Sequence, residues 1–152
     1  MQKLCDLFLC EPTKTHRLKY ISLFDKVFLH DPEGQYSGFL RANIDRIKMI
    51  SIVCDLRKDG IDCFSAPIAY RDRANLSIER AFALAMGYAR SKNAEVSRGI
   101  QSKCPPVYWM FDLLHNQEDE RAGGTVMIVR LDGHVWTSSE YEEYMYDFNN
   151  IF

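Results

Sequence analysis

The stretch that decides the fold is residues 104–152, CPPVYWMFDLLHNQEDERAGGTVMIVRLDGHVWTSSEYEEYMYDFNNIF. Residues 107–114 follow two prolines and are rich in aromatic and branched side chains, which favour a strand. Residues 125–131 form a second such run. The Asp-Gly pair at 132–133 then predicts a type I′ hairpin turn, which needs positive φ at both positions. With residues 134–136 returning as a third strand, we expect a three-stranded antiparallel meander.

A helix is expected to follow the meander, because Thr137 and Glu140 have the spacing of a capping box. Carboxylates in the first turn are favourable there, since they face the positive end of the helix dipole. Four apolar side chains then recur with helical spacing: Tyr141, Tyr144, Met145 and Phe148. The sequence therefore ends in an acidic, tyrosine-rich amphipathic helix.

The N-terminal part of the chain is more ambiguous. Residues 2–10 are apolar enough to pack, as either a short helix or an edge strand. A cap at Thr13 or Thr15 predicts a helix that runs to about Leu29. Its expected buried stripe is Tyr20, Leu23, Phe24, Val27 and Phe28.

A second helix is expected from Tyr36 or Ser37 to the Arg57–Gly60 stop, although residues 50–53 also read as a strand. Its apolar stripe would be Leu40, Ile44, Ile47, Ser51 and Cys54. Residues 60–76 read as a connection with one short strand, at 63–64 or at 68–70, and with a charged surface cluster at 71–73.

A third helix is expected after an Asn75 or Ser77 cap and extends to about Lys92. It is rich in alanine, which favours a helix and permits close packing. Its expected buried stripe is Ile78, Phe82, Ala85, Met86 and Ala89. Gly87 lies in the middle of this helix and predicts either a tight packing contact or a kink. Residues 93–103 read as a polar linker.

These elements predict an α+β fold in which N-terminal helices pack on one face of a curved antiparallel sheet. A single domain spanning residues 1–152 is expected from the length. The chain is 47% hydrophobic and 26% charged, which is typical of globular proteins and excludes a disordered one. Its apolar runs are too short to span a bilayer, and the N-terminus lacks signal-peptide features, so we expect a cytoplasmic protein.

The sequence predicts neither a metal nor a cofactor. The five cysteines show no CxxC pair and no disulfide framework, so buried, reduced thiols are expected. The four histidines are far apart, and neither HxxxH nor HExxH occurs. Dinucleotide, phosphate-loop and nucleophile-elbow motifs are also absent from the sequence.

The charge is divided unevenly along the chain. Residues 1–104 carry 17 Lys and Arg against 12 Asp and Glu, whereas residues 105–152 carry 2 against 9. An acidic C-terminal region would steer a basic partner toward it and would repel the phosphates of nucleic acid. The alternative is that these carboxylates are simply solvated.

The order of features over residues 78–137 resembles the C-terminal half of NTF2-like immunity proteins of bacterial polymorphic toxin systems. The matching parts are the alanine-rich helix AFALAMGYAR (81–90), the strand VYWMF (107–111) and the segment AGGTVMIVRLDGHVW (122–136). The resemblance implies an NTF2-like fold and a non-enzymatic protein. Such a protein would bind one cognate toxin domain and block its active site.

We expect the partner to be a basic toxin domain, with nucleases among the candidates. Tyrosine beside carboxylates suits a protein interface, because rigid rings bury area while carboxylates meet Lys or Arg. The expected partner-binding residues are Tyr141, Glu142, Glu143, Tyr146 and Asp147, with a second patch at Glu118, Asp119 and Glu120. The alternative reading places Tyr141 and Tyr144 in the core.

Two other function classes stay open at this point. In the first, a concave pocket binds a small ligand or catalyses a reaction, with Asp112, His115 and His134 meeting across the meander as an acid–base group. In the second, the chain is a structural or adaptor subunit that forms a homo-oligomer through an exposed sheet face.

Overall fold

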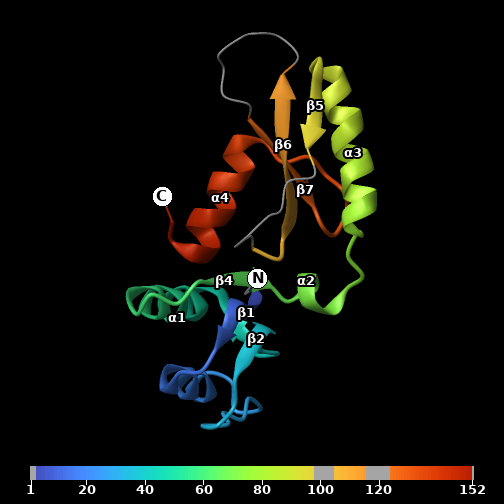
Figure 1. Ribbon diagram of the computed structural model, residues 1–152. Helices are drawn as coiled ribbons and strands as arrows, with labels where there is room; N and C mark the ends of the chain where they lie inside the picture. The colour runs from blue at the N-terminus through green and yellow to red at the C-terminus, as the bar shows by residue number, and fades with distance from the viewer. Residues whose placement is uncertain (1–2, 98–104, 116–123, 152) are drawn as a thin grey trace.

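The computed structural model describes residues 3–97, 105–115 and 124–151. These residues form an α+β fold, as predicted, with two antiparallel sheets rather than one. The sheets lie at opposite ends of the molecule, and the C-terminal helix lies against both (Figure 1). The expectation of a single curved sheet covered by N-terminal helices is therefore wrong.

The first sheet is built around β1 (Leu4–Thr13). Strand β4 (Cys63–Pro67) pairs with one edge of β1, and β2 (Tyr36–Phe39) and β3 (Ile44–Asp45) pair with the other, all antiparallel. Residues 4–10 thus belong to a central strand, neither a helix nor an edge strand. The predicted short strand at 63–64 is confirmed and is longer than expected.

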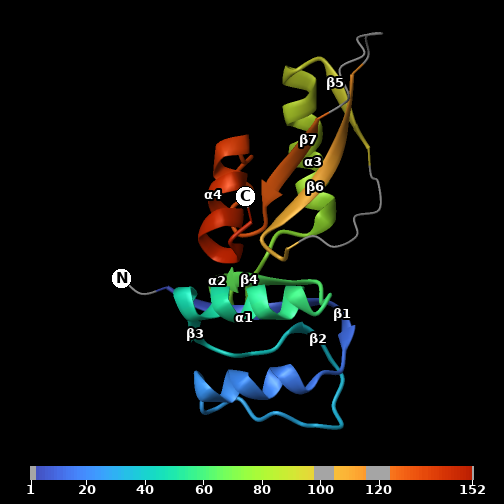
Figure 2. The same cartoon turned by 90° about the vertical axis from the view of Figure 1, so that its left-hand side faces the viewer.

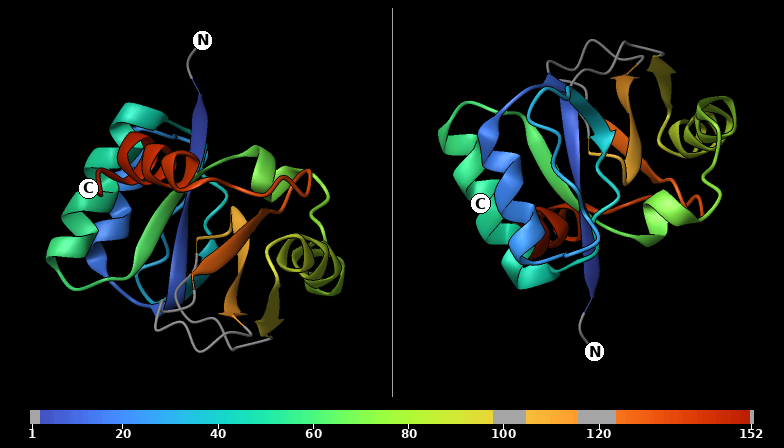
Figure 3. Two further views of the ribbon diagram at one scale, coloured as in Figure 1. Left: turned by 90° about the horizontal axis from the view of Figure 1, so that it is seen from above. Right: turned by 90° about the horizontal axis from the view of Figure 1, so that it is seen from below.

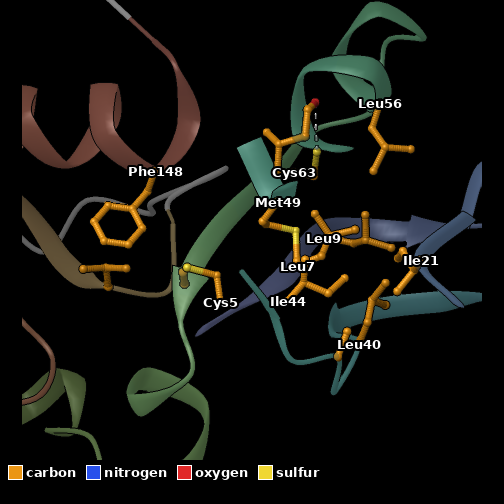
Figure 4. Packing of buried hydrophobic residues seen from close by; sticks show 14 of the residues in the cluster. Cys5, Leu7, Leu9, Ile21, Leu40, Ile44, Met49, Leu56, Cys63 and Phe148 are labelled. Carbon is orange, nitrogen blue, oxygen red and sulfur yellow. Dashed lines mark hydrogen bonds between the residues drawn. The ribbon is translucent and has the colours of Figure 1, made fainter. Parts of the chain in front are cut away.

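Helices cover this sheet and complete its core. Helix α1 (Arg46–Lys58) and the 3₁₀ helix η1 (His16–Leu23) lie on the same side of β1, with α1 nearer to the C-terminal helix (Figure 2 and Figure 3). Leu7 and Leu9 of β1 are buried among apolar side chains of the neighbouring elements (Figure 4). The neighbours labelled there are Ile21, Leu40, Ile44, Met49 and Leu56.

The predicted first helix begins at the expected Thr15 cap but ends at Leu23 and has 3₁₀ geometry. A 3₁₀ helix has three residues per turn, so its buried positions are Leu18 and Ile21. The stripe predicted from α-helical spacing is therefore wrong for Tyr20, Leu23, Phe24 and Val27, which are exposed, and right for Phe28, which is buried.

The second predicted helix starts ten residues later than expected, at Arg46 after an Asp45 cap. The segment before it turns through Arg41, which has φ 68°, because the buried Asp6 carboxylate accepts the backbone N–H groups of Arg41 and Ala42. The predicted stripe is only partly right: Leu40 and Ile44 are buried but precede α1, and Ile47 and Ser51 are exposed. The buried residues of α1 itself are Met49, Val53 and Leu56. The predicted stop at Arg57–Gly60 is confirmed.

The charged cluster at 71–73 is not wholly on the surface. Arg71 lies in the short helix α2 (Ala69–Asp72), and its side chain is largely buried. Its guanidinium contacts the Asp6 carboxylate at 3.3 Å and donates to the carbonyl of Ala42 at 2.9 Å. Because a buried charge needs a partner, this pair closes the loop that precedes α1.

The second sheet has the order β5–β6–β7, formed by Ala94–Ser97, Tyr108–His115 and Thr125–Val129. Strands β6 and β7 were predicted, whereas β5 lies in the segment that was expected to be a linker. The predicted third strand at 134–136 makes a single bridge, between Val135 and Ile128. The turn before it has positive φ at Gly133 alone, so it is not type I′.

Helix α3 (Ile78–Ser91) covers one face of this sheet and is capped by Ser77, as predicted. Its buried positions are Ala81, Ala85 and Ala89, which lets the helix approach the sheet closely. Ile78 is exposed, and Phe82 and Met86 are half-buried, so the predicted stripe is only partly right. Gly87 is exposed and has no close packing contact.

Helix α4 (Ser138–Asn149) is the element that joins the two sheets. Its predicted capping box is present, with Thr137 and Glu140 each accepting the other's backbone N–H. Tyr144, Met145 and Phe148 are buried, and they share one core with the first sheet. Seen from above, α4 crosses over the first sheet next to α1 (Figure 3).

Candidate functional site

A groove of about 280 Å³ lies where α4 faces β4 and α2. We call it the α4 groove. It is lined by residues from both halves of the chain: Lys3, Pro67, Tyr70, Val107, Trp136, Glu140, Glu143, Tyr144, Asp147 and Phe148. Carboxylates and aromatic rings dominate this lining, so the groove has the chemistry expected of a site for a cationic group.

The carboxylates of the groove come from one face of α4. Glu140, Glu143 and Asp147 are three and seven residues apart, a spacing that stacks side chains on the same side of a helix. Lys3 is the cation within the described lining, and its ammonium group lies 5.5 Å from the ring of Phe148. The lining therefore keeps a negative formal charge.

The aromatic floor of the groove is rigid. The ring of Tyr144 stacks on Phe148 with centroids 5.4 Å apart and packs against Trp136 at 5.6 Å. The Tyr144 hydroxyl donates to the carbonyl of Ser65 at 2.6 Å. Burial raises the pKa of Tyr144 well above its usual range, so this residue holds a neutral, fixed position.

One end of the groove is fixed by the helix cap. The Glu140 carboxylate accepts the backbone N–H of Thr137 at 3.1 Å and contacts Nε2 of His134 at 2.9 Å. These interactions lower the pKa of Glu140, the hydrogen bond from Thr137 most strongly. A negative charge therefore stays in place at this end at neutral pH.

The other end is fixed by a buried network. The side-chain oxygen of Asn149 accepts the backbone N–H of Ser65 at 2.8 Å and a guanidinium N–H of Arg57 at 3.2 Å. Arg57 also donates to the carbonyls of Asn149 and Cys63. Because α1, β4 and α4 meet in this network, the lining residues from these elements keep fixed relative positions.

The predicted site residues of α4 divide into two sets. Glu143 and Asp147 line the groove. Glu142 and Tyr146 are exposed but do not line it, and Tyr141 is half-buried with its ring 6.1 Å from that of Tyr108. The second predicted patch, at Glu118, Asp119 and Glu120, lies outside the described residues.

Most of the lining was not predicted as a site. Tyr144 and Phe148 were predicted as core, which they are, and they also line the groove. Lys3, Pro67 and Tyr70 reach the groove from distant parts of the sequence, whereas Trp136 directly precedes the cap of α4. No local pattern marks such residues, because only the packing of β1, α2 and α4 brings them together.

The proposed acid–base group at the meander does not assemble. In the register of the second sheet, Asp112 lies opposite Thr125. His134 instead lies opposite Val129, since the Val129 N–H donates to its carbonyl. Four residues of strand separate the two positions, which is about 13 Å. The side chain of His115 lies outside the described residues.

The described ranges contain no group of three or more His, Cys, Asp or Glu side chains that could hold a metal ion. No described helix has the length and hydrophobicity needed to cross a membrane. Cys5 and Cys63 are buried, Cys10 and Cys54 are half-buried, and none of these four described cysteines forms a disulfide. Burial raises the pKa of Cys63 to about 12. Cys104 lies outside the described residues.

No protein-family model matches the chain, and neither a curated protein nor a solved structure matches it.

Proposed function

We propose that this protein is an immunity protein, which binds a basic toxin domain through the α4 groove and blocks the active site of that domain. The carrying observation is the acidic rim of Glu140, Glu143 and Asp147 above a rigid aromatic floor. The resemblance of residues 78–137 to NTF2-like immunity proteins also supports the proposal, and membership of that family is part of it.

The groove suits a lysine or arginine side chain of the partner. A cation gains from the faces of aromatic rings and from carboxylates at the same time, and arginine uses both best. A volume of about 280 Å³ lies just below the usual range for small-molecule pockets, which favours a side chain over a larger ligand. Basic residues are common in the clefts of enzymes that act on nucleic acids, so blocking them would inhibit such a toxin.

The groove is also preorganised for binding. The network around Asn149 and the hydrogen bond of Tyr144 hold the floor, and the helix cap holds Glu140. A site that is already rigid loses little conformational entropy when a partner docks. Tight binding therefore needs only a few well-placed contacts.

The proposal is tested by co-purification from the cells that make the protein. We expect an affinity-tagged chain to retain one basic protein in a stoichiometric complex that high salt dissociates, because the contact is largely electrostatic. That partner should be lethal when expressed alone and harmless when expressed together with this chain. Recovery of a monomer or homo-oligomer without a partner, or of a partner whose toxicity the chain does not relieve, would contradict the proposal.

A further inference from the structure

A second groove, of about 360 Å³, lies between η1 and α1, and α1 lies between η1 and α4 (Figure 2). We call it the η1–α1 groove. Its apolar lining consists of Tyr20, Leu23, Phe24, Ile52 and Leu56. Nothing in the α4 proposal uses this groove, and its chemistry is different, because apolar side chains rather than carboxylates dominate it.

The apolar side chains of η1 are unusually exposed. Leu23 is 72% exposed and Val27, just beyond the helix, is 86% exposed. The cause is the 3₁₀ geometry, since three residues per turn bury Leu18 and Ile21 and direct Tyr20 and Leu23 outward. A cluster of exposed apolar side chains beside a groove is typical of a surface that binds another molecule.

The charges around the groove are positive on balance, because Lys19 and Lys48 lie beside its aromatic rings and Asp55 is the carboxylate of its described lining. The ammonium group of Lys19 lies 5.2 Å from the ring of Tyr20, and that of Lys48 lies 5.9 Å from the ring of Phe24. The charge of Arg17 is already compensated by an ion pair with Asp59. Lys19 and Lys48 would therefore form favourable electrostatic contacts with negatively charged groups of a molecule bound in the groove.

We propose that the η1–α1 groove binds an amphipathic helix of a partner protein, with apolar anchors at helical spacing and Asp or Glu beside them. A furrow between two helices accommodates the apolar face of a third, the common helix-in-groove mode. Charge argues against a symmetric contact with a second copy, because two copies would bring four lysines, Lys19 and Lys48 of each, together with only two Asp55 carboxylates. The groove thus selects an acidic helix, whereas the α4 groove selects a basic group.

The test begins with selection from a random peptide library displayed on phage, using the purified full chain as bait. We expect the enriched peptides to share Leu, Ile or Phe at helical spacing and a net negative charge. Their affinity, measured by fluorescence anisotropy, should fall at least about tenfold in Leu23→Glu, because a charged side chain cannot be buried in an apolar contact. The double variant Lys19→Glu, Lys48→Glu should weaken binding as well and should reduce its salt dependence.

Leu114→Glu is the matched control, since Leu114 is also an exposed leucine but lies on β6 in the other half of the molecule. It should bind the enriched peptides like the wild type. Circular dichroism checks that each variant is folded, which the exposure of the replaced side chains leads us to expect.

Three results would overturn the proposal. The first is that no enriched peptide depends on Leu23 for binding, or that the Leu23-dependent peptides are basic; basic peptides that bind independently of Leu23 are expected at the α4 groove. The second is concentration-dependent self-association in sedimentation experiments that Leu23→Glu abolishes, which would make a second copy the occupant. The third is Leu23-dependent binding to vesicles that contain phosphatidylserine without any peptide binding, which would assign the surface to a membrane.

Discussion

Asn149 is fully buried at the C-terminal end of α4, and its side-chain oxygen accepts hydrogen bonds from Ser65 and Arg57. Asn149→Ala would leave both donors without that acceptor in a buried place. We expect a loss of about 2–3 kcal/mol in the free energy of unfolding, measured by urea denaturation. Asn75→Ala, which removes an exposed side chain, is the control and should change stability by less than about 0.5 kcal/mol. Equal stability of the two variants would contradict this role of Asn149.

Glu140 gives a second test at this scale. Its lowered pKa means that the folded state favours the ionised carboxylate. The resulting stabilisation is complete above the ordinary glutamate pKa of 4.5 and is lost as the pH falls through the lower folded-state value. We expect Glu140→Gln, which keeps a capping oxygen but not the charge, to lose this part of the pH dependence in urea titrations. An unchanged acid limb in the variant would show that Glu140 does not contribute to it.

How far a residue's role can be predicted depends on the distance to its partners. The capping pair of Thr137 and Glu140 was predicted, because both residues lie in one turn of sequence. The roles of Asn149 and Arg71 were not, since their partners Arg57 and Asp6 lie 92 and 65 residues away. From the sequence alone, each would be expected at the surface because it is polar, and only the tertiary structure shows that its side chain is largely buried.

At the scale of elements, two glycines should respond in opposite ways to alanine. A Cβ on Gly87 would meet nothing within 4 Å, and this glycine lies inside α3. We expect Gly87→Ala to raise stability by about 0.5–1 kcal/mol, since glycine is the poorer helix former. Gly133 has φ 78°, and a Cβ there would approach Leu84 to 2.8 Å. Gly133→Ala should therefore lower stability by about 1 kcal/mol or more, as thermal denaturation can show. Destabilisation by Gly87→Ala would mean that a close contact exists in α3 after all.

Elements with a strong local pattern were predicted, and those that depend on tertiary contacts were not. Strands β6 and β7 and helices α3 and α4 have clear apolar periods and caps. Strand β5 is short and half polar, so its sequence has no strand pattern and was interpreted as a linker. Its pairing with β6 is what makes it a strand. The 3₁₀ geometry of η1 was missed because the periodicity was read as 3.6 residues per turn.

The same distinction holds for the candidate site. One helix supplies its carboxylates, and the sequence already indicated that helix as acidic and tyrosine-rich. Of the predicted residues, Glu143 and Asp147 line the α4 groove, and Glu142 does not. The groove itself could not be predicted, since Lys3, Tyr70 and Trp136 meet only when β1, α2 and α4 pack together.

At the scale of the whole molecule, the uneven charge of the chain becomes two surfaces of different character. The α4 groove is acidic, and the charges around the η1–α1 groove are positive on balance. The two grooves share no lining residue, and α1 lies between η1 and α4 (Figure 2), so one partner could occupy each without competing. Such an arrangement fits a binding protein, whose function depends on where its surfaces lie.

The most direct test of the central claim compares two neighbouring charge reversals on α4 by co-purification. Glu143→Lys places a lysine in the α4 groove, whereas Glu142→Lys makes the same charge change on the same helix outside it. We predict that the wild type and Glu142→Lys retain one basic protein, and that Glu143→Lys loses it while staying folded. Retention of that protein by Glu143→Lys with unchanged affinity and salt dependence would contradict the account.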